Sequence, residues 1–239
     1  MTRLYRKNQL AFSLAWAGLY VVLFSAADSL SASLGTAKLV TAPLCLAMTA
    51  LLALWIGKNG LGEIYGLSRV RLDCRRYLYF LPLVLIASTN LWGGFTMRFS
   101  PLETGLYVVS MLCVGFLEEV IFRGLLFKAL WADAENVGWA VLLSSLTFGM
   151  GHIVNLLNGA QLLPTLLQIC YATAIGFLFT VLFLRSGTLL PCILTHSAVN
   201  SLSAFAVERT GALDIAAAAV LTAVSLAYAL WILRRSARP

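Results

Sequence analysis

Residues 104–124 read TGLYVVSMLCVGFLEEVIFRG, an almost wholly apolar run that ends in two adjacent carboxylates, Glu118 and Glu119, followed by Arg123. The apolar part predicts a membrane-spanning helix, because a span takes about 20 such residues. A charge at mid-bilayer costs about 2.5–3.5 kcal/mol on insertion scales, so ionisable side chains inside such a run indicate a functional site. This stretch therefore sets both the expected fold and the expected place of any chemistry.

The rest of the chain has the same apolar character. Of the 239 residues, 60% are hydrophobic and 11% are charged, and the mean hydropathy is +0.88, whereas soluble domains carry roughly 25% charged residues. Helices are expected, because a lipid-embedded segment must satisfy its own backbone hydrogen bonds. The predicted fold is an all-α, polytopic transmembrane helix bundle that forms a single integral membrane domain over residues 1–239. Its eight expected spans are 8–27, 39–57, 77–97, 104–131, 137–157, 162–184, 188–207 and 215–233.

The net charge of +7 is attributed to membrane topology and not to nucleic-acid binding. With the N-terminus inside, eight spans place 14 of the 17 Lys and Arg residues at the inner side, as the positive-inside rule requires. These are Arg3, Arg6, Lys7, Lys58, Arg69, Arg71, Arg75, Arg76, Arg123, Lys128, Arg185, Arg234, Arg235 and Arg238. We therefore expect both termini in the cytoplasm and a multi-pass protein of the cell (plasma or inner) membrane. The basic segment 58–76 is interpreted as a topological anchor.

The embedded ionisable groups are expected to have different roles. Eight of the ten acids lie in loops or near span ends, whereas Glu118 and Glu119 are embedded. The only two histidines, His152 and His196, also lie inside predicted spans. Glu119 and Arg123 are i and i+4 on one helix face, in the favourable order for an ion pair. Because Glu118 is rotated by about 100° from Glu119, the pattern predicts a structural Glu119–Arg123 pair and leaves Glu118 for chemistry.

Two further patterns contain the histidines. Phe148 and His152 are i and i+4 in one predicted span, and His196 and Asn200 have the same spacing in another. At 1.5 Å per residue, Glu118 and His152 lie roughly 20 and 21 Å from the inner ends of their helices. The corresponding depths are roughly 12 Å for His196 and 18 Å for Asn200. The four groups are therefore expected to meet in one layer inside the bilayer.

Taken together, the three patterns resemble a known family. EEVIFR fits EExxxR, FGMGH fits FxxxH and HSAVN fits HxxxN, in that order along the chain. This is similar to the CPBP (Abi-like) family of CAAX proteases and bacteriocin-processing enzymes, which are intramembrane glutamic endopeptidases. The motif-bearing catalytic core covers about residues 104–207.

The resemblance implies a role for each matched residue. Glu118 would act as the general base that activates a water, and His152 would orient that water. His196 and Asn200 would donate hydrogen bonds to the oxyanion of the intermediate. The residues that support the site would be Glu119, Arg123 and Phe148. The resemblance also implies a metal-independent peptidase without a cofactor, acting in the lipid bilayer on a membrane-anchored or lipidated protein or peptide.

Other interpretations of the same residues stay open. Glu118, His152 and His196 have the donor types of a hydrolytic zinc site, although no HExxH helix is present. Embedded Glu and His side chains also mark ion pathways, so a transporter is an alternative, as is a non-proteolytic binding or immunity protein. A serine or cysteine hydrolase is disfavoured, because the sequence has no GxSxG elbow. No pattern predicts a cleavage sequence or an oligomeric state.

Overall fold

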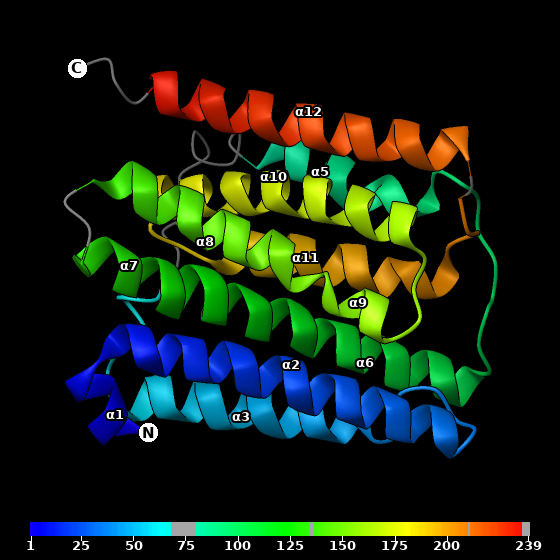
Figure 1. Ribbon diagram of the computed structural model, residues 1–239, viewed down its shortest axis with the longest axis horizontal. Coiled ribbons are helices and arrows are strands. Elements are labelled where there is room, and N and C mark those ends of the chain that lie inside the picture. Colours follow the sequence, from blue (N-terminus) through cyan, green and yellow to red (C-terminus); the bar gives the residue numbers. More distant parts are fainter. Residues whose placement is uncertain (68–79, 134–135, 210, 236–239) are drawn as a thin grey trace.

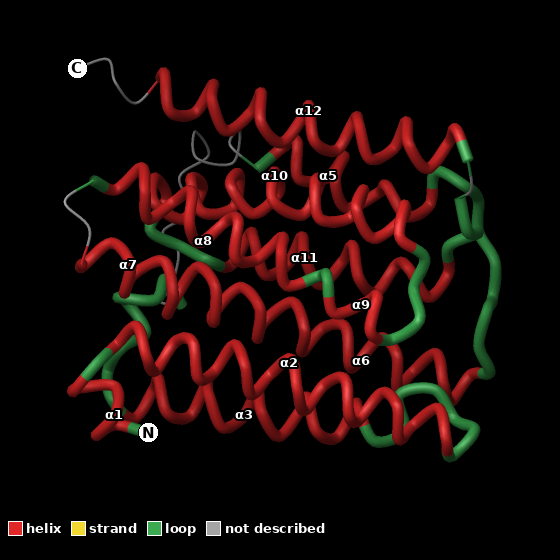
Figure 2. The backbone as a smooth tube through the Cα atoms, in the orientation of Figure 1, coloured by secondary structure: helices red, strands yellow, loops and turns green. Residues whose placement is uncertain are grey.

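The computed structural model describes residues 1–67, 80–133, 136–209 and 211–235. Within these ranges the chain is helical apart from its loops, and the extended contact is an isolated antiparallel bridge between Phe95 and Ala206. The helices run side by side in one bundle, and the loops gather at its two ends (Figure 1, Figure 2). The predicted all-α fold is confirmed for the part of the chain that the structure describes.

Among the described residues, six helical segments are long and apolar enough to cross a membrane. Each corresponds to one of the predicted spans. They are α2 (Gln9–Ser33); α3 (Thr41–Lys58); the run of α6 (Pro101–Glu118), η2 (Glu119–Leu126) and α7 (Phe127–Asp133); α8 (Val137–Gly151) with α9 (Val154–Leu157); α10 (Leu162–Ser186); and α12 (Ala212–Arg235). A short helix, α1 (Thr2–Lys7), precedes them.

The other two predicted spans correspond to shorter helices. α5 (Leu81–Ser88) continues into η1 (Thr89–Leu91), and α11 (Leu190–Leu202) continues into η3 (Ser203–Phe205). Both helices are shorter than a membrane span, which needs about 20 residues. Nevertheless, α11 packs inside the bundle against α6 and α5. The described helices therefore support six of the eight predicted spans by their length. Residues 77–79 of the predicted third span lie outside the described residues.

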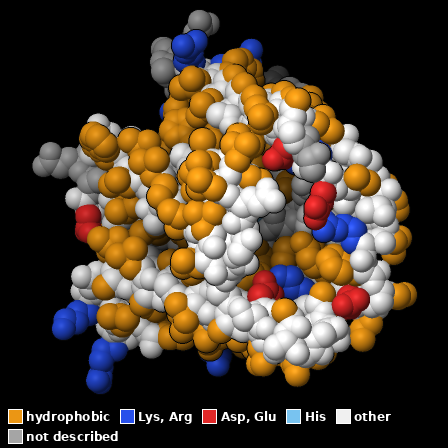
Figure 3. Space-filling view, turned by 45° about the vertical axis from the view of Figure 1, so that its right-hand side comes forward, with side chains coloured by type: hydrophobic (Ala, Val, Ile, Leu, Met, Phe, Trp, Pro, Cys, Tyr) orange, Lys and Arg blue, Asp and Glu red, His pale blue; other side chains and the backbone are white. Residues whose placement is uncertain are grey.

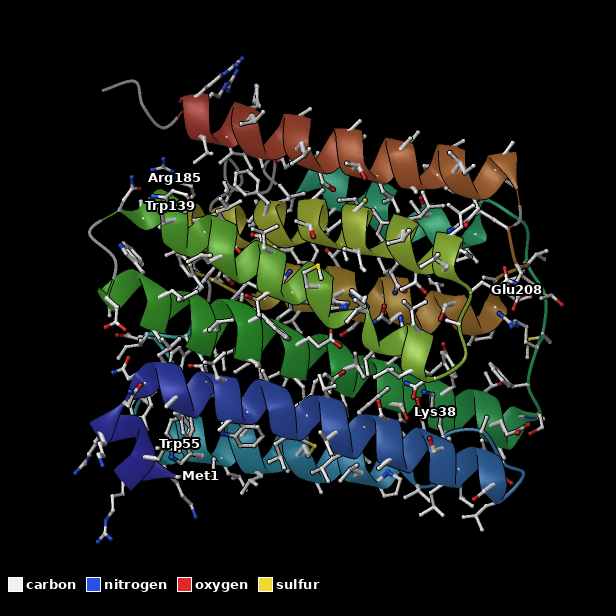
Figure 4. All side chains as sticks on the ribbon, viewed as in Figure 1. Met1, Lys38, Trp55, Trp139, Arg185 and Glu208 are labelled. Atoms are coloured by element: carbon white, nitrogen blue, oxygen red, sulfur yellow. The ribbon has the colours of Figure 1, made fainter. Side chains whose placement is uncertain are left out.

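Long helices that follow each other directly run in opposite directions, whereas α3 and α6, with α5 between them, run in the same direction, as do α10 and α12, with α11 between them (Figure 1). α2 leaves the end at which α1 lies, and α12 returns to it. We call this the terminal end, where Figure 4 labels Trp55 and Arg185, and the opposite end the distal end, where it labels Glu208. The distal end also contains the loop 34–40 between α2 and α3. Of the basic segment 58–76, residues 68–76 lie outside the described residues.

The span that bears the two carboxylates begins regularly and then changes its geometry. α6 starts at a capping box, in which the Ser100 hydroxyl accepts from the Glu103 amide and the Glu103 carboxylate accepts from the Ser100 amide; Pro101 takes the first helical position, where its missing N–H does no harm. The expectation of one regular α-helix over 104–131 is wrong from Glu119 to Leu126, where the backbone is π-helical and every residue is buried. Such segments occur frequently at functional sites.

Candidate active site

A cavity of about 440 Å³ lies inside the bundle. α6, α8 with α9, α10 and α11 contribute to its walls, together with α2 and η1. The lining includes the four side chains predicted to be catalytic: Glu118, His152, His196 and Asn200. The structure thus brings together, from three separate helices, the groups that the depth argument places in one layer.

Glu118 is the last residue of α6, and its side chain is 13% exposed, toward the cavity. The Tyr20 hydroxyl, from α2, donates a hydrogen bond of 2.6 Å to Glu118 Oε1. His196 Nε2, from α11, lies 3.5 Å from Glu118 Oε2. Sequence reasoning did not identify Tyr20, because a tyrosine within an apolar span carries no signal that distinguishes it from a packing residue. The Glu118 carboxylate is therefore held by a neutral donor and an imidazole while it faces the cavity.

The predicted ion pair between Glu119 and Arg123 is present. Arg123 Nη1 lies 3.0 Å from Glu119 Oε1, and both side chains are 0% exposed. The guanidinium carbon of Arg123 also lies 3.8 Å from the centre of the Phe148 ring, at a distance typical of a cation–π contact. Because the charges of this pair are fully buried, each depends on the other for its stabilisation.

Glu119 has a second contact that the sequence analysis missed. Its Oε1 lies 2.7 Å from His196 Nδ1, so Glu119 binds both Arg123 and the histidine of the third motif. Helix phase relates residues of one helix and contains no information about α11, which is why this contact could not be predicted. A carboxylate on one ring nitrogen fixes the orientation of a histidine, and here it leaves Nε2 facing Glu118.

Phe148 lies between the two histidines. Its ring makes edge-to-face contacts with His152, at 5.5 Å between ring centres, and with His196, at 5.8 Å. α8 ends at Gly151, and His152 is the residue that caps its C-terminus before the chain turns into α9. The predicted span 137–157 is therefore interrupted at His152, which places the imidazole at a helix end on the cavity wall.

Asn200 lies on α11, one turn beyond His196, and lines the same cavity. The backbone next to it is tied to η1, because the Asn90 amide donates a hydrogen bond of 2.5 Å to the Val199 carbonyl oxygen. This hydrogen bond therefore fixes the position of α11 along the bundle next to Asn200. The side-chain amide of Asn200 can supply hydrogen-bond donors to a group bound in the cavity.

The donor types for a metal are present, but their arrangement differs from a metal site. Within the described ranges, no group of three His, Cys, Asp or Glu side chains is placed to hold a metal ion. One ring nitrogen of His196 is engaged by Glu119. The described residues therefore provide no set of ligands for the zinc site that the sequence left open.

Comparison with known proteins gives one match. No curated protein and no solved structure matches the chain. The family model described as type II CAAX prenyl endopeptidase Rce1-like matches residues 100–202, which include all three motifs. Residues 100–202 thus carry the sequence pattern of the CAAX protease family, as the three motifs predict.

Proposed function

We propose that this protein is an intramembrane glutamic endopeptidase that hydrolyses a peptide bond of a membrane-anchored or lipidated protein or peptide, without a metal or cofactor. One observation carries the proposal: the carboxylate of Glu118 faces a cavity that His152, His196 and Asn200 also line. The match to an endopeptidase family over these residues supports the same reaction class. A cavity of about 440 Å³ is in the range of pockets that enclose small ligands, so it fits a short extended peptide segment better than a folded domain.

In the proposed mechanism, Glu118 is the general base. Its carboxylate takes a proton from a water in the cavity, and the oxygen of that water attacks the carbonyl carbon of the scissile bond. His152, which also lines the cavity, orients the water. The hydrogen bond from Tyr20 to Glu118 Oε1 holds the carboxylate in place, and Oε2 faces the His196 imidazole.

His196 and Asn200 would stabilise the oxyanion of the tetrahedral intermediate. Loss of one such donor typically costs about 10²–10³ in rate. If His196 Nδ1 donates to Glu119, Nε2 can also donate to the oxyanion only when the ring carries both protons. The protonated Glu118 then transfers its proton to the leaving amine, which restores the carboxylate.

The proposal includes a membrane topology of eight crossings, with both termini in the cytoplasm of a cell whose plasma or inner membrane holds the protein. α1 and the C-terminal part of α12 lie at the same end of the bundle (Figure 1), which agrees with an even number of crossings. The motif-bearing region, about residues 104–207, would be the catalytic part of one membrane domain. Tyr20 shows that α2, outside that region, also contacts the catalytic carboxylate.

The Glu118→Gln variant tests the proposal, because it keeps the size of the side chain and removes the base. Protein termini in membranes that contain the active protein would be compared with those from membranes that contain the variant. We expect a set of new N-termini that depends on Glu118. Glu208→Gln is the matched control, since Glu208 is 74% exposed in an ion pair with Arg98 and does not line the cavity. Equal sets of termini for the active protein and Glu118→Gln would falsify the catalytic role.

A further inference from the structure

The cavity is elongated and extends from Glu118 toward the distal end of the bundle. On α2, Tyr20 contacts Glu118, and Asp28 lines the cavity eight residues later, which is about 12 Å along a helix. Asp28 accepts hydrogen bonds of 2.6 and 2.9 Å from Lys38 in the distal loop 34–40, and Lys38 is also a wall residue. The path from the catalytic carboxylate therefore reaches the distal loops.

We place the mouth of the cavity between α2 and the segment that follows α9, because the lining there includes an exposed residue. Asn158, an exposed residue, lines the cavity there, and its amide donates a hydrogen bond of 3.3 Å to the Ser25 hydroxyl of α2. Figure 3, which turns the distal end forward, shows a hollow in the surface with acidic and basic side chains beside it. A single hydrogen bond between two polar side chains is a weak closure, worth about 0.5–1.5 kcal/mol.

In the opposite direction, toward the terminal end, the interior is packed with apolar side chains. η2 and α7 continue from Glu118 to the terminal end, and Val120, Ile121 and Phe127 on them are 0% exposed. They belong to one hydrophobic core with residues of α3 and α10. The distal side is therefore the side from which the described structure admits water and a peptide to Glu118.

The two ends also differ in charge. Basic side chains at the terminal end include Arg3, Arg6, Lys7, Lys58, Arg185, Arg234 and Arg235. At the distal end, Lys38, Arg98 and Arg209 each lie within 4 Å of an acid: Asp28, Glu208 and Asp214 respectively. By the positive-inside rule, the terminal end faces the cytoplasm and the distal end faces away from it.

From the position of the mouth and the charge of the two ends, we infer that the active-site cavity opens on the non-cytoplasmic side of the membrane. This inference rests on the proposed function and narrows its substrate class. The substrates are membrane-anchored proteins or peptides whose scissile bond lies outside the cytoplasm, close to the membrane surface. A lipidated C-terminus that is presented from the cytoplasm does not reach Glu118 by this route.

Cysteine accessibility in oriented membrane vesicles tests the inference without any substrate. Glu118→Cys places a thiol at the catalytic position, and Ser203→Cys, a nearly isosteric change, places one on the same cavity wall. Lys58→Cys is the control at the terminal end. Each variant is treated with a small charged methanethiosulfonate that does not cross membranes, in right-side-out and in inside-out vesicles. Labelling is measured above that of the parent protein, which has five cysteines.

We expect the two cavity thiols to react at least tenfold faster in right-side-out vesicles, and the Lys58→Cys thiol to react at least tenfold faster in inside-out vesicles. Reaction of all three thiols from one side would overturn the position of the mouth. If the cavity thiols react faster in inside-out vesicles and the Lys58→Cys thiol reacts faster in right-side-out vesicles, the inferred orientation of the protein in the membrane is overturned. Neither result depends on cleavage, so a failure here is distinct from a failure of the Glu118→Gln comparison, which tests the proposed function itself.

Discussion

Gly115 lies at a close contact between α6 and α11, the two helices that carry Glu118 and His196. It is on α6, one turn before Glu118, and faces Ser197 of α11, the residue after His196. A Cβ atom at position 115 would lie 2.7 Å from the Ser197 amide nitrogen and 2.9 Å from its Cα, both backbone atoms. Backbone atoms cannot move aside as a flexible side chain can. Gly115→Ala therefore forces α6 and α11 apart.

The expected loss of activity follows from the size of that displacement. Ordinary van der Waals contact begins at 3.4 Å, so the helices must separate by about 0.7 Å at this point. A misplacement of 1 Å at an active site can cost about 10²-fold in rate. We expect the cleavage rate of Gly115→Ala to fall on the order of 10- to 100-fold. Because Gly115→Ala alters neither the Glu118 nor the His196 side chain, this loss of rate would come from the changed distance between them.

The assay is the rate at which a Glu118-dependent N-terminus appears in membranes, normalised to the amount of folded protein in detergent. Gly105→Ala is the matched control on the same helix, because its Cβ would meet no atom within 4 Å. Alanine is favoured over glycine within a helix by about 1 kcal/mol, so this control should fold at least as well as the parent and cleave at the same rate. A Gly115→Ala protein that cleaves as fast as Gly105→Ala would refute the claim that this contact sets the distance between the catalytic groups.

Three further predictions concern Tyr20, the buried ion pair of Glu119 and the dependence on metal. Tyr20→Phe keeps the ring and removes the hydrogen bond to the Glu118 carboxylate, a kind of bond worth about 1.5–3 kcal/mol. The kcat of the folded protein should fall roughly 10- to 100-fold, and an unchanged kcat would show that Tyr20 only packs. Glu119→Ala leaves the buried charge of Arg123 without its partner and should destabilise the protein by about 3–5 kcal/mol, measured by unfolding in detergent. Glu208→Ala breaks an exposed ion pair and should lower the free energy of unfolding by about 0–1 kcal/mol. Equal losses of stability in Glu119→Ala and Glu208→Ala would contradict the argument that burial makes the Glu119–Arg123 pair the more important one. Exhaustive chelation should leave the cleavage rate unchanged, and a loss that zinc restores would favour the metal interpretation.

The features that depend on local sequence were predictable. A lipid-embedded helix needs a long apolar run, so six of the eight predicted spans could be located from composition, although the first helix continues to Ser33, beyond its predicted end at residue 27. The Glu119–Arg123 pair was also predictable, because both residues belong to one helix and their spacing brings the side chains together. The shared layer of Glu118 and the histidines followed from helix rise in the same way.

Contacts between helices were not predictable from such rules. Tyr20 and Glu118 are 98 residues apart in sequence, and His196 and Glu119 are 77 residues apart. Their contacts depend on how the helices pack and rotate around their axes, and neither hydropathy nor spacing within one helix specifies that rotation. The π-helical turn after Glu118 is a further example, since an EEVIFRG stretch has no residue that forbids regular α-helix.

These contacts between helices bear on the charge balance of the proposed mechanism. Glu119 joins Arg123 to His196, and His196 in turn faces Glu118. When Glu118 takes the proton from water, its negative charge passes to the oxyanion that forms beside His196, so the total charge within the membrane does not change during attack. In this mechanism the Glu119–Arg123 pair would be more than a structural support: Arg123 balances the buried charge of Glu119, and Glu119 holds the His196 ring in the orientation that leaves Nε2 facing Glu118.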